Sequence, residues 1–181
     1  MTEPAAIEVL LGDDRWTDVG LASLAAQAID AVCRVCAVPA GYVVSVLGCD
    51  DREIARLNAD FRDKPSATNV LSWPDQDLAP LSPGDVPGPL PDPTGFDDTL
   101  GDIAISYDTC LVEAQAAGLA LKDHVTHLMV HGCLHLLGYD HEHERDAVRM
   151  EALEVKILAD LGVSNPYLPR RLGSADVGSK D

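Results

Sequence analysis

Three histidines lie within eleven residues of this chain, at positions 131, 135 and 141, in the spacing H-x3-H-x5-H. The apolar residues before them, at positions 125, 128, 129 and 130, follow a helical spacing. His131 and His135 are therefore expected one turn apart on the same face of a central helix. Gly138 suits the left-handed conformation that ends a helix and would return His141 to the same point. Three neutral imidazoles with an open fourth position are the ligand set of a catalytic zinc ion, so the motif predicts a metal site held by His131, His135 and His141.

A closed structural zinc site is the alternative to an open catalytic one. Such a site recruits a fourth protein ligand, often cysteine, but Cys133 lies two residues from His131 and from His135 and points to another side of the helix. His127 extends the same helical stripe, yet about 12 Å of helix rise separates it from His135, so we expect it to support the site. The remaining histidines, at positions 124 and 143, are predicted to be exposed.

The spacing is related to the zinc peptidase signature H-E-x-x-H-x-x-G-x-x-H, with one informative difference. The glutamate that activates water in that signature is replaced here by Gly132, which has no side chain to accept a proton. The sequence therefore predicts the metal scaffold without the standard peptidase chemistry.

The length and composition of the chain are typical of one soluble domain, because 181 residues with 46% hydrophobic content can bury a sizeable core. No apolar run approaches the ~20 residues that a membrane span needs, and the N-terminus lacks the features of a signal peptide. Five cysteines, an odd number, favour reduced thiols in the cytoplasm over a disulfide framework. Cys33 and Cys36 form a C-x-x-C inside an alanine-rich helical segment, and we interpret them as core or partner-facing residues.

The net charge of −17 argues against a broad electrostatic grip on nucleic acid, because phosphate binding depends on lysine and arginine. The positive charges are unevenly distributed, however. Basic residues cluster at positions 52, 56, 62 and 64, and two more arginines occupy positions 170 and 171. A solvated helix face is the ordinary interpretation of such a cluster, and a local basic groove on an acidic protein is the alternative.

Hydrophobic periodicity predicts both strands and helices in one domain of residues 1–165. Strands are expected near residues 7–11, 42–47, 68–73 and 100–106, and helices near residues 17–36, 51–61, 108–117, 122–137 and 144–161. Residues 74–98 contain seven prolines and six aspartates without lysine or arginine, which predicts a mobile, solvated acidic loop inside the domain. Residues 166–181 form a C-terminal tail that is predicted to be disordered after Arg171.

Four segments of the chain carry a resemblance to a known family. Residues 131–141 read H-G-C-L-H-L-L-G-Y-D-H. The other three segments are Ile54, Leu57, Asn58, Phe61 and Arg62 followed by residues 68–72, then residues 100–106, and then Met150, Glu151 and Glu154 in the closing helix. In this order they resemble the signatures of the YbeY family of bacterial metal-dependent endoribonucleases, also called rRNA maturation factors. The resemblance covers most of residues 7–161.

The resemblance implies an α+β fold in which a mixed four-stranded sheet packs with about five helices, one of them the central helix with the zinc ligands. It implies one Zn²⁺ per chain, held by His131, His135 and His141, and hydrolytic cleavage of single-stranded RNA. Arg62 matches the arginine on which the family's activity depends, so Arg62 and His131 are the candidate catalytic residues.

The family acts in ribosomal RNA maturation near the 3′ end of the small-subunit RNA and in ribosome quality control. The implied partners are therefore single-stranded RNA, the small ribosomal subunit and its assembly factors, in the cytoplasm and without a membrane. Two departures from the family pattern are Trp73, where phenylalanine is usual, and residues 74–98, which are longer than the usual connection. From charge alone, Arg62 would pair with a surface carboxylate such as Asp60 or Asp63.

The residues by themselves leave several roles open. Asp140 is suited either to capping the turn after Gly138 or to orienting a histidine, and Asn69, Ser72 and Asp102 either face the cleft or occupy turns and edges. The sequence identifies no general base, and either water or the ribose 2′-hydroxyl can be the nucleophile. The alternative functions are a metallohydrolase acting on a non-RNA substrate and a ribosome-assembly binding factor with a structural zinc.

Overall fold

The computed structural model describes residues 5–168 of the chain. In chain order the elements are β1 (Ala6–Leu11), α1 (Arg15–Val19), α2 (Leu21–Val35), β2 (Val43–Cys49), α3 (Asp51–Arg62), β3 (Val70–Pro74), β4 (Thr99–Ser106), α4 (Tyr107–Ala117), α5 (Leu121–Leu136) and α6 (Glu144–Asp160). The predicted α+β fold is confirmed. Six helices stand within the described residues because Gly20, with a φ of 77°, divides the first predicted helix into α1 and α2. The predicted disorder after Arg171, like Arg170 itself, lies outside the described residues.

The sheet is mixed because one of its four strands is reversed. The strand order is β1-β2-β4-β3, in which β1, β2 and β4 are parallel neighbours and β3 runs antiparallel to β4. The hydroxyl of Ser72 on β3 donates to the carbonyl of Gly132 on α5 at 3.2 Å. The edge strand β3 therefore lies directly against the helix that carries the histidines.

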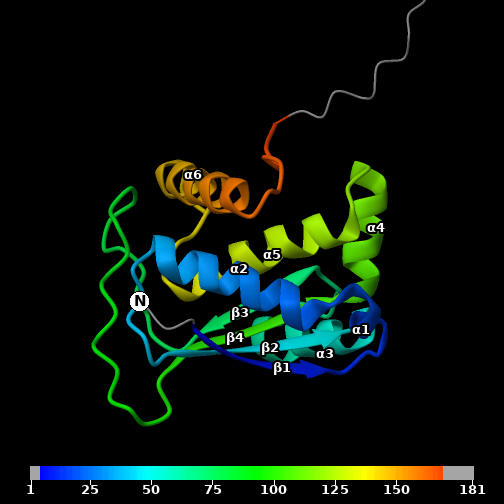
Figure 1. Cartoon of the computed structure of the whole chain (residues 1–181), viewed down its shortest axis with the longest axis horizontal. Helices are drawn as coiled ribbons and strands as arrows, with labels where there is room; N and C mark the ends of the chain where they lie inside the picture. The colour runs from blue at the N-terminus through cyan, green and yellow to red at the C-terminus, as the bar shows by residue number, and fades with distance from the viewer. Residues whose placement is uncertain (1–4, 169–181) are drawn as a thin grey trace, which may run out of the picture.

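Helices α2 and α5 cover one face of the sheet, and α3 lies on the other (Figure 1). The central helix is α5, which packs against β3, β4, α2, α4 and α6. Its core-facing residues Val125, Met129, Cys133 and Leu136 are almost fully buried. One side of α5 is thus anchored in the core, and this anchoring fixes the position of the histidines on its other side.

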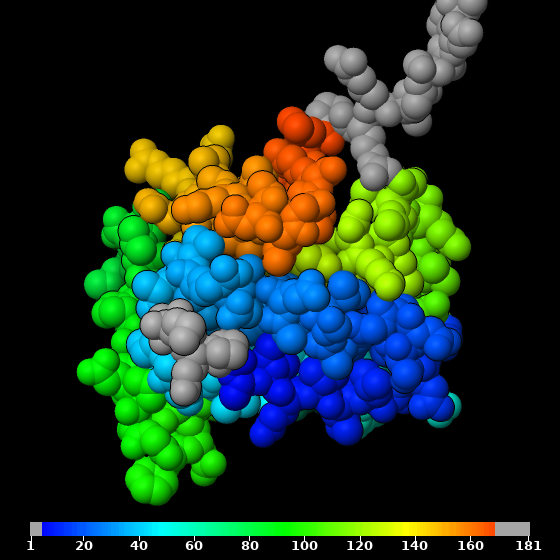
Figure 2. Space-filling model, viewed as in Figure 1, coloured from blue at the N-terminus to red at the C-terminus, as the bar shows by residue number. Residues whose placement is uncertain are grey.

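The acidic loop of residues 75–98 forms no helix or strand, but it is attached to the rest of the molecule. Figure 2 shows it in green along one side of the protein, below α6. The Gly84 N–H donates to Asp146 on α6 at 2.7 Å, and Arg149 donates to the Gly84 carbonyl at 2.8 Å. Leu78 is buried. The expectation of a solvated excursion is wrong at these points, because composition does not reveal contacts with a helix some sixty residues away.

The cysteines are free thiols, as their odd number predicted. Cys33, on α2, is buried in the core, and Cys36 is half-buried. Of the two interpretations, core or partner-facing, the structure supports the core, because Cys33 belongs to it and Cys36 packs against it. None of the helices between residues 5 and 168 combines the length and apolar content that a bilayer span requires.

Candidate metal centre

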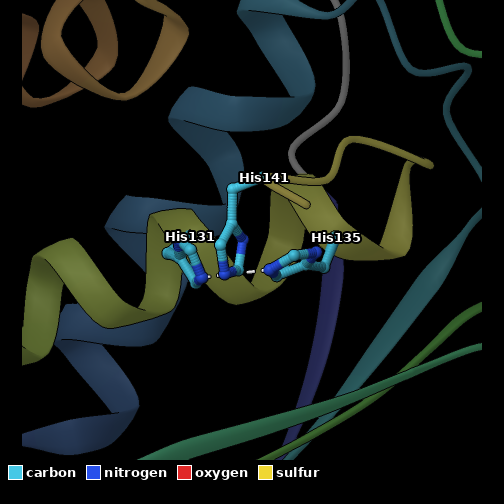
Figure 3. Close-up of side chains that lie close together, drawn as sticks. All are labelled: His131, His135 and His141. Atoms are coloured by element: carbon cyan, nitrogen blue, oxygen red, sulfur yellow. Dashed lines mark hydrogen bonds between the residues drawn. The ribbon is translucent and has the colours of Figure 1, made fainter. Parts of the chain in front are cut away.

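Helix α5 and the turn after it bring the three predicted histidines together. His131 and His135 lie one turn apart on the same face of α5, and His141 returns toward them from the turn (Figure 3). Gly138 allows this return with a φ of 96°, and its N–H donates to the His135 carbonyl at 3.1 Å. A Cβ at Gly138 would lie 2.6 Å from the Leu78 carbonyl oxygen, so the close approach of the acidic loop also requires glycine here. The predicted turn is confirmed.

The hydrogen bonds of the two helical histidines determine which ring nitrogen faces the centre. His131 Nδ1 lies 2.6 Å from Glu154 Oε1, and His135 Nδ1 lies 2.9 Å from the Tyr139 carbonyl oxygen. A carbonyl and an ionised carboxylate only accept hydrogen bonds, so each Nδ1 carries the ring proton and each Nε2 offers a lone pair. The two Nε2 atoms are 3.0 Å apart. Lone pairs that face each other at this distance are stabilised by a cation between them.

The three rings are suited to a single metal ion. The His141 ring centroid lies 5.3 Å from that of His131 and 5.2 Å from that of His135, and one nitrogen of each ring lies within 4.8 Å of the others. Zinc–nitrogen bonds of ~2.0–2.1 Å in a tetrahedron separate the ligand atoms by about 3.4 Å, close to the observed Nε2–Nε2 contact. Burial, and then the neighbouring His131, lower the pKa of His135 to about 4, which leaves the neutral imidazole that binds metals. Within residues 5–168 this group has three members, the number of protein ligands that catalytic zinc sites use.

Glu154 on α6 is a fully buried carboxylate directly behind this group. It accepts hydrogen bonds from His131 Nδ1 at 2.6 Å, from His127 Nε2 at 3.0 Å and from the Tyr167 hydroxyl. Burial alone would raise the pKa of Glu154, but the three hydrogen bonds outweigh it and lower the pKa to about 2. Glu154 is therefore ionised and orients His131, and His127 takes the supporting position that its spacing predicted.

Replacing Glu154 by glutamine is expected to weaken zinc binding by ~10–100-fold, because an outer partner of a metal ligand sets the orientation and basicity of that ligand. The amide keeps the size of the carboxylate but loses its charge. Its N–H₂ group replaces one of the two oxygens that accept hydrogen bonds from His131, His127 and Tyr167. A competitive titration with a chromophoric zinc chelator measures the change. Glu144→Gln, at an exposed position of the same helix, is the control. Equal zinc affinity in the two variants would contradict the orienting role.

A cleft of about 960 Å³ runs along the histidine face of α5. Its size is near the upper end of the ~300–1,000 Å³ that small-ligand sites occupy. The cleft is lined by residues from the start of β3, from α5, from the turn after α5, from the first part of the acidic loop, and by Arg62 and Tyr167.

Arg62, the last residue of α3, is the single arginine or lysine among the described residues that line this cleft. Its Nη2 donates to the Ser72 carbonyl at 3.4 Å. The pairing with Asp60 or Asp63 that charge alone would favour is absent from the ion pairs of the described residues, and Asp60 lies instead 3.8 Å from Arg56. The guanidinium of Arg62 is thus free to bind an anionic ligand in the cleft that the histidines also line. Arg62 is exposed like the rest of the basic cluster, but it is the member of that cluster that lines the cleft.

The other candidate residues fall on different sides of the sheet. Asn69 and Ser72 line the cleft, whereas Asp102 lies in a groove on the opposite face. Asp140 acts at the turn, where its Oδ1 accepts from the His141 backbone N–H at 2.7 Å and lies 3.7 Å from His141 Nδ1. Asp140 therefore caps the turn, and its carboxylate lies beside His141.

The predicted exposure of His124 is wrong. Its Nε2 lies 2.7 Å from Glu113 Oε2 on α4, and 12% of its side chain is exposed in the cleft wall. Helical spacing on α5 cannot reveal this partner, because α4 is placed beside α5 only by the fold. His143 is exposed, as predicted.

The glycine that replaces the peptidase glutamate has a packing role. A Cβ at Gly132 would lie 3.1 Å from Ser72 Oγ and 3.3 Å from Ile103 Cγ2, because α5 packs closely against β3 and β4 at this point. The position is inside the helix–sheet interface and has no room for a glutamate. The close packing of α5 on the sheet therefore explains why a glycine occupies the position of the peptidase glutamate.

Three site residues were given no role in the sequence analysis: Glu154, Glu113 and Tyr167. Glu154 did have a recognisable signal, because it shares a helical stripe with Met150 and Leu158, and a carboxylate on a buried apolar stripe needs a partner. Glu113 and Tyr167 lie in segments whose local pattern is that of ordinary surface residues.

A central helix that presents two histidines to a third from the following turn, in a cleft with one arginine among its described residues, defines an α+β protein with a three-histidine group suited to holding a metal ion. The family model described as Endoribonuclease YbeY matches residues 12–162. This chain is 52% identical to the Endoribonuclease YbeY of Dinoroseobacter shibae over 165 residues, which cover 90% of this chain and 91% of that protein. It is 54% identical to the Endoribonuclease YbeY of Ruegeria pomeroyi over 163 residues, 89% of this chain and 97% of that protein. The chain belongs to the YbeY endoribonuclease family.

The fold is also similar to a solved structure. The solution structure of a Thermotoga maritima protein matches with a TM-score of 0.52 at 18% identity, over 90% of this chain and 99% of that one. At this identity the similarity concerns the fold alone.

Proposed function

We propose that this chain is a zinc-dependent endoribonuclease that cleaves single-stranded RNA, acts in ribosomal RNA maturation near the 3′ end of the small-subunit RNA, and contributes to ribosome quality control. The observation that carries the proposal is the placement of the three-histidine group and Arg62 in one cleft. This cleft belongs to a chain about half identical, over nine tenths of its length, to proteins named Endoribonuclease YbeY.

The residues of the cleft divide the proposed chemistry among them. A zinc ion held by His131, His135 and His141 would supply Lewis-acid polarisation of a phosphate oxygen and activation of a nucleophile near neutral pH. The Arg62 guanidinium would bind two phosphate oxygens and stabilise the negative charge that builds up during cleavage. The ionised Glu154 would keep His131 in the tautomer that directs Nε2 toward the metal.

The proposed partners are the small ribosomal subunit and its assembly factors in the cytoplasm. The charge of the protein supports a partner-assisted mode of action. A net charge of −17 and a single arginine among the described residues of the cleft supply little general attraction for RNA phosphates. Contacts with proteins of the subunit would then bring the enzyme to its substrate.

Cleavage of a labelled single-stranded RNA by zinc-loaded protein tests the proposal, with the same RNA annealed to its complement as the comparison substrate. We expect cutting of the single strand alone, loss of cutting on chelation, and recovery when zinc is added back. Circular dichroism of the chelated protein separates the catalytic from the structural role of zinc. The apolar core between α2, α5 and the sheet does not include the three histidines, so the chelated protein is expected to stay folded. Unfolding on chelation would favour the assembly factor with a structural zinc, and a folded, zinc-loaded protein that cuts no RNA would contradict the proposal.

A further inference from the structure

The cleft along α5 has two chemically different ends, one on each side of the metal centre. The acidic end is formed by Asp77, Asp140 and Glu142, close to His141. The aromatic end lies toward the start of α5 and is formed by Thr68, Asn69, His124, His127 and Tyr167. The eleven residue steps of helix from His124 to His135 span about 16 Å. Among the described residues that line the aromatic end there is no carboxylate, lysine or arginine.

Tyr167 places a fixed aromatic ring in the wall of the aromatic end. It follows α6 in the segment that returns across the cleft, and its hydroxyl donates to the buried Glu154. Its ring packs edge-to-face with His127, with centroids 5.8 Å apart and planes at 84°. Burial, and then Glu154, raise the pKa of Tyr167, so the hydroxyl remains a donor. Despite these attachments the residue is 44% exposed, and the ring therefore offers apolar surface to a ligand in the cleft.

The polar side chains beside this ring are also held in place from behind. Glu113 on α4 accepts from the Asn69 side-chain amide at 3.1 Å and lies 2.7 Å from His124 Nε2. Both Asn69 and His124 line the cleft, whereas Glu113 is not among the lining residues. Asn69, His124, His127 and Tyr167 are thus pre-organised at the aromatic end by Glu113 and Glu154, two carboxylates that do not line the cleft.

We propose that the aromatic end is a binding subsite for the nucleotide next to the scissile bond, whose unpaired base stacks on the ring of Tyr167. This inference rests on the proposed function. A phosphate would need a cationic group, and the described residues that line this end include no lysine or arginine, whereas a base offers a flat π-face that matches the exposed ring of Tyr167. A base can stack in this way only when it is unpaired, so the subsite also accounts for a preference for single strands.

Fluorescence of 2-aminopurine, which is quenched when the base stacks, tests the subsite directly. The probe is a single-stranded hexanucleotide of 2′-O-methyl residues, which removes the 2′-hydroxyl as a nucleophile, with 2-aminopurine placed at each position in turn. Binding to the zinc-loaded protein is followed by fluorescence anisotropy, the probe is checked for integrity on a gel, and the zinc content of every preparation is measured. The variants are Tyr167→Ala and Tyr167→Phe. Phe96→Ala, which removes an exposed aromatic ring on the acidic loop outside the cleft, is the matched control.

We expect quenching at one position of the probe with the wild type, with Phe96→Ala and with Tyr167→Phe. Tyr167→Ala should lose this quenching and bind ~5–150-fold more weakly, the range for loss of one stacked base. The phenylalanine variant loses the same hydrogen bond to Glu154 as the alanine variant, so the comparison isolates the ring from any effect on the metal centre. Equal affinity and quenching with Tyr167→Ala would overturn the subsite and leave the proposed function standing. Failure of the wild type to bind the probe would instead contradict direct recognition of single-stranded RNA by this cleft, and the subsite with it.

Discussion

Replacing His135 by alanine is expected to abolish RNA cleavage and stoichiometric zinc binding together, while the protein stays folded. His135 supplies an Nε2 lone pair on the helix, and its removal leaves one ligand from α5 and one from the turn. Two nitrogen ligands do not hold zinc at a site that normally uses three. The loss of affinity should exceed the ~10–100-fold expected when only an outer partner of a ligand is removed. Zinc analysis of the purified protein and a single-stranded RNA cleavage assay, run on the same preparations, measure the two effects.

The matched control for this variant is His143→Ala, which removes an exposed imidazole two residues beyond the third histidine. It should retain zinc and activity. A contaminating ribonuclease would appear as equal cutting by the wild type and both variants. A His135→Ala protein that keeps one zinc per chain and its activity would locate the metal elsewhere and refute the three-histidine site.

Replacing Arg62 by alanine is expected to lower the rate of RNA cleavage by ~10²–10³-fold, the usual effect of removing a donor that stabilises charge in the transition state. Zinc content should be unchanged, because Arg62 lies on α3 and contacts none of the three histidines. The guanidinium lines the cleft without a carboxylate partner among the described residues, so its loss removes one long hydrogen bond to the Ser72 carbonyl and no ion pair, and the fold should be unaffected. Single-turnover rates at saturating enzyme separate this effect from weaker RNA binding.

Arg56→Ala is the control for Arg62→Ala, because it removes a guanidinium from the same helix at a position outside the cleft. Arg62→Lys adds a second comparison: lysine keeps the charge but cannot bind two phosphate oxygens with one planar group, so its rate should lie between those of the wild type and the alanine variant. Equal rates for Arg56→Ala and Arg62→Ala would remove Arg62 from the chemistry. Loss of zinc from Arg62→Ala would assign it a structural role instead.

The sequence by itself determined the three-histidine group. The relative positions of His131 and His135 depend only on helical spacing, and the return of His141 depends on the backbone conformation of Gly138 after the helix. The proximity of the three histidines therefore follows from residues within one short segment. The strands and helices followed from hydrophobic periodicity for the same reason. Where a local exception occurred, as at Gly20, it changed the number of helices without changing the fold.

The partners of the histidines were decided only by the tertiary structure. Glu154 is 23 residues from His131 in the chain and reaches it because α6 packs on α5. Glu113 reaches His124 through the packing of α4 on α5, and this contact reversed the predicted exposure of His124. Asp102 belongs to the same family signature as its strand neighbours, yet the alternation of side chains along β4 puts it on the opposite face from the cleft.

The acidic loop and Arg62 illustrate the same physical limit. Composition described the loop as solvated, but its hydrogen bonds to Asp146 and Arg149 on α6 attach it to the molecule. Charge predicted a solvated helix face for Arg62, and the residue is exposed, but because the end of α3 lies beside β3 it also lines the cleft. Residue spacing and composition predict contacts between residues that are close together in the sequence. Which side chains meet across elements depends on how the helices pack on the sheet, and that packing is set by the whole core at once.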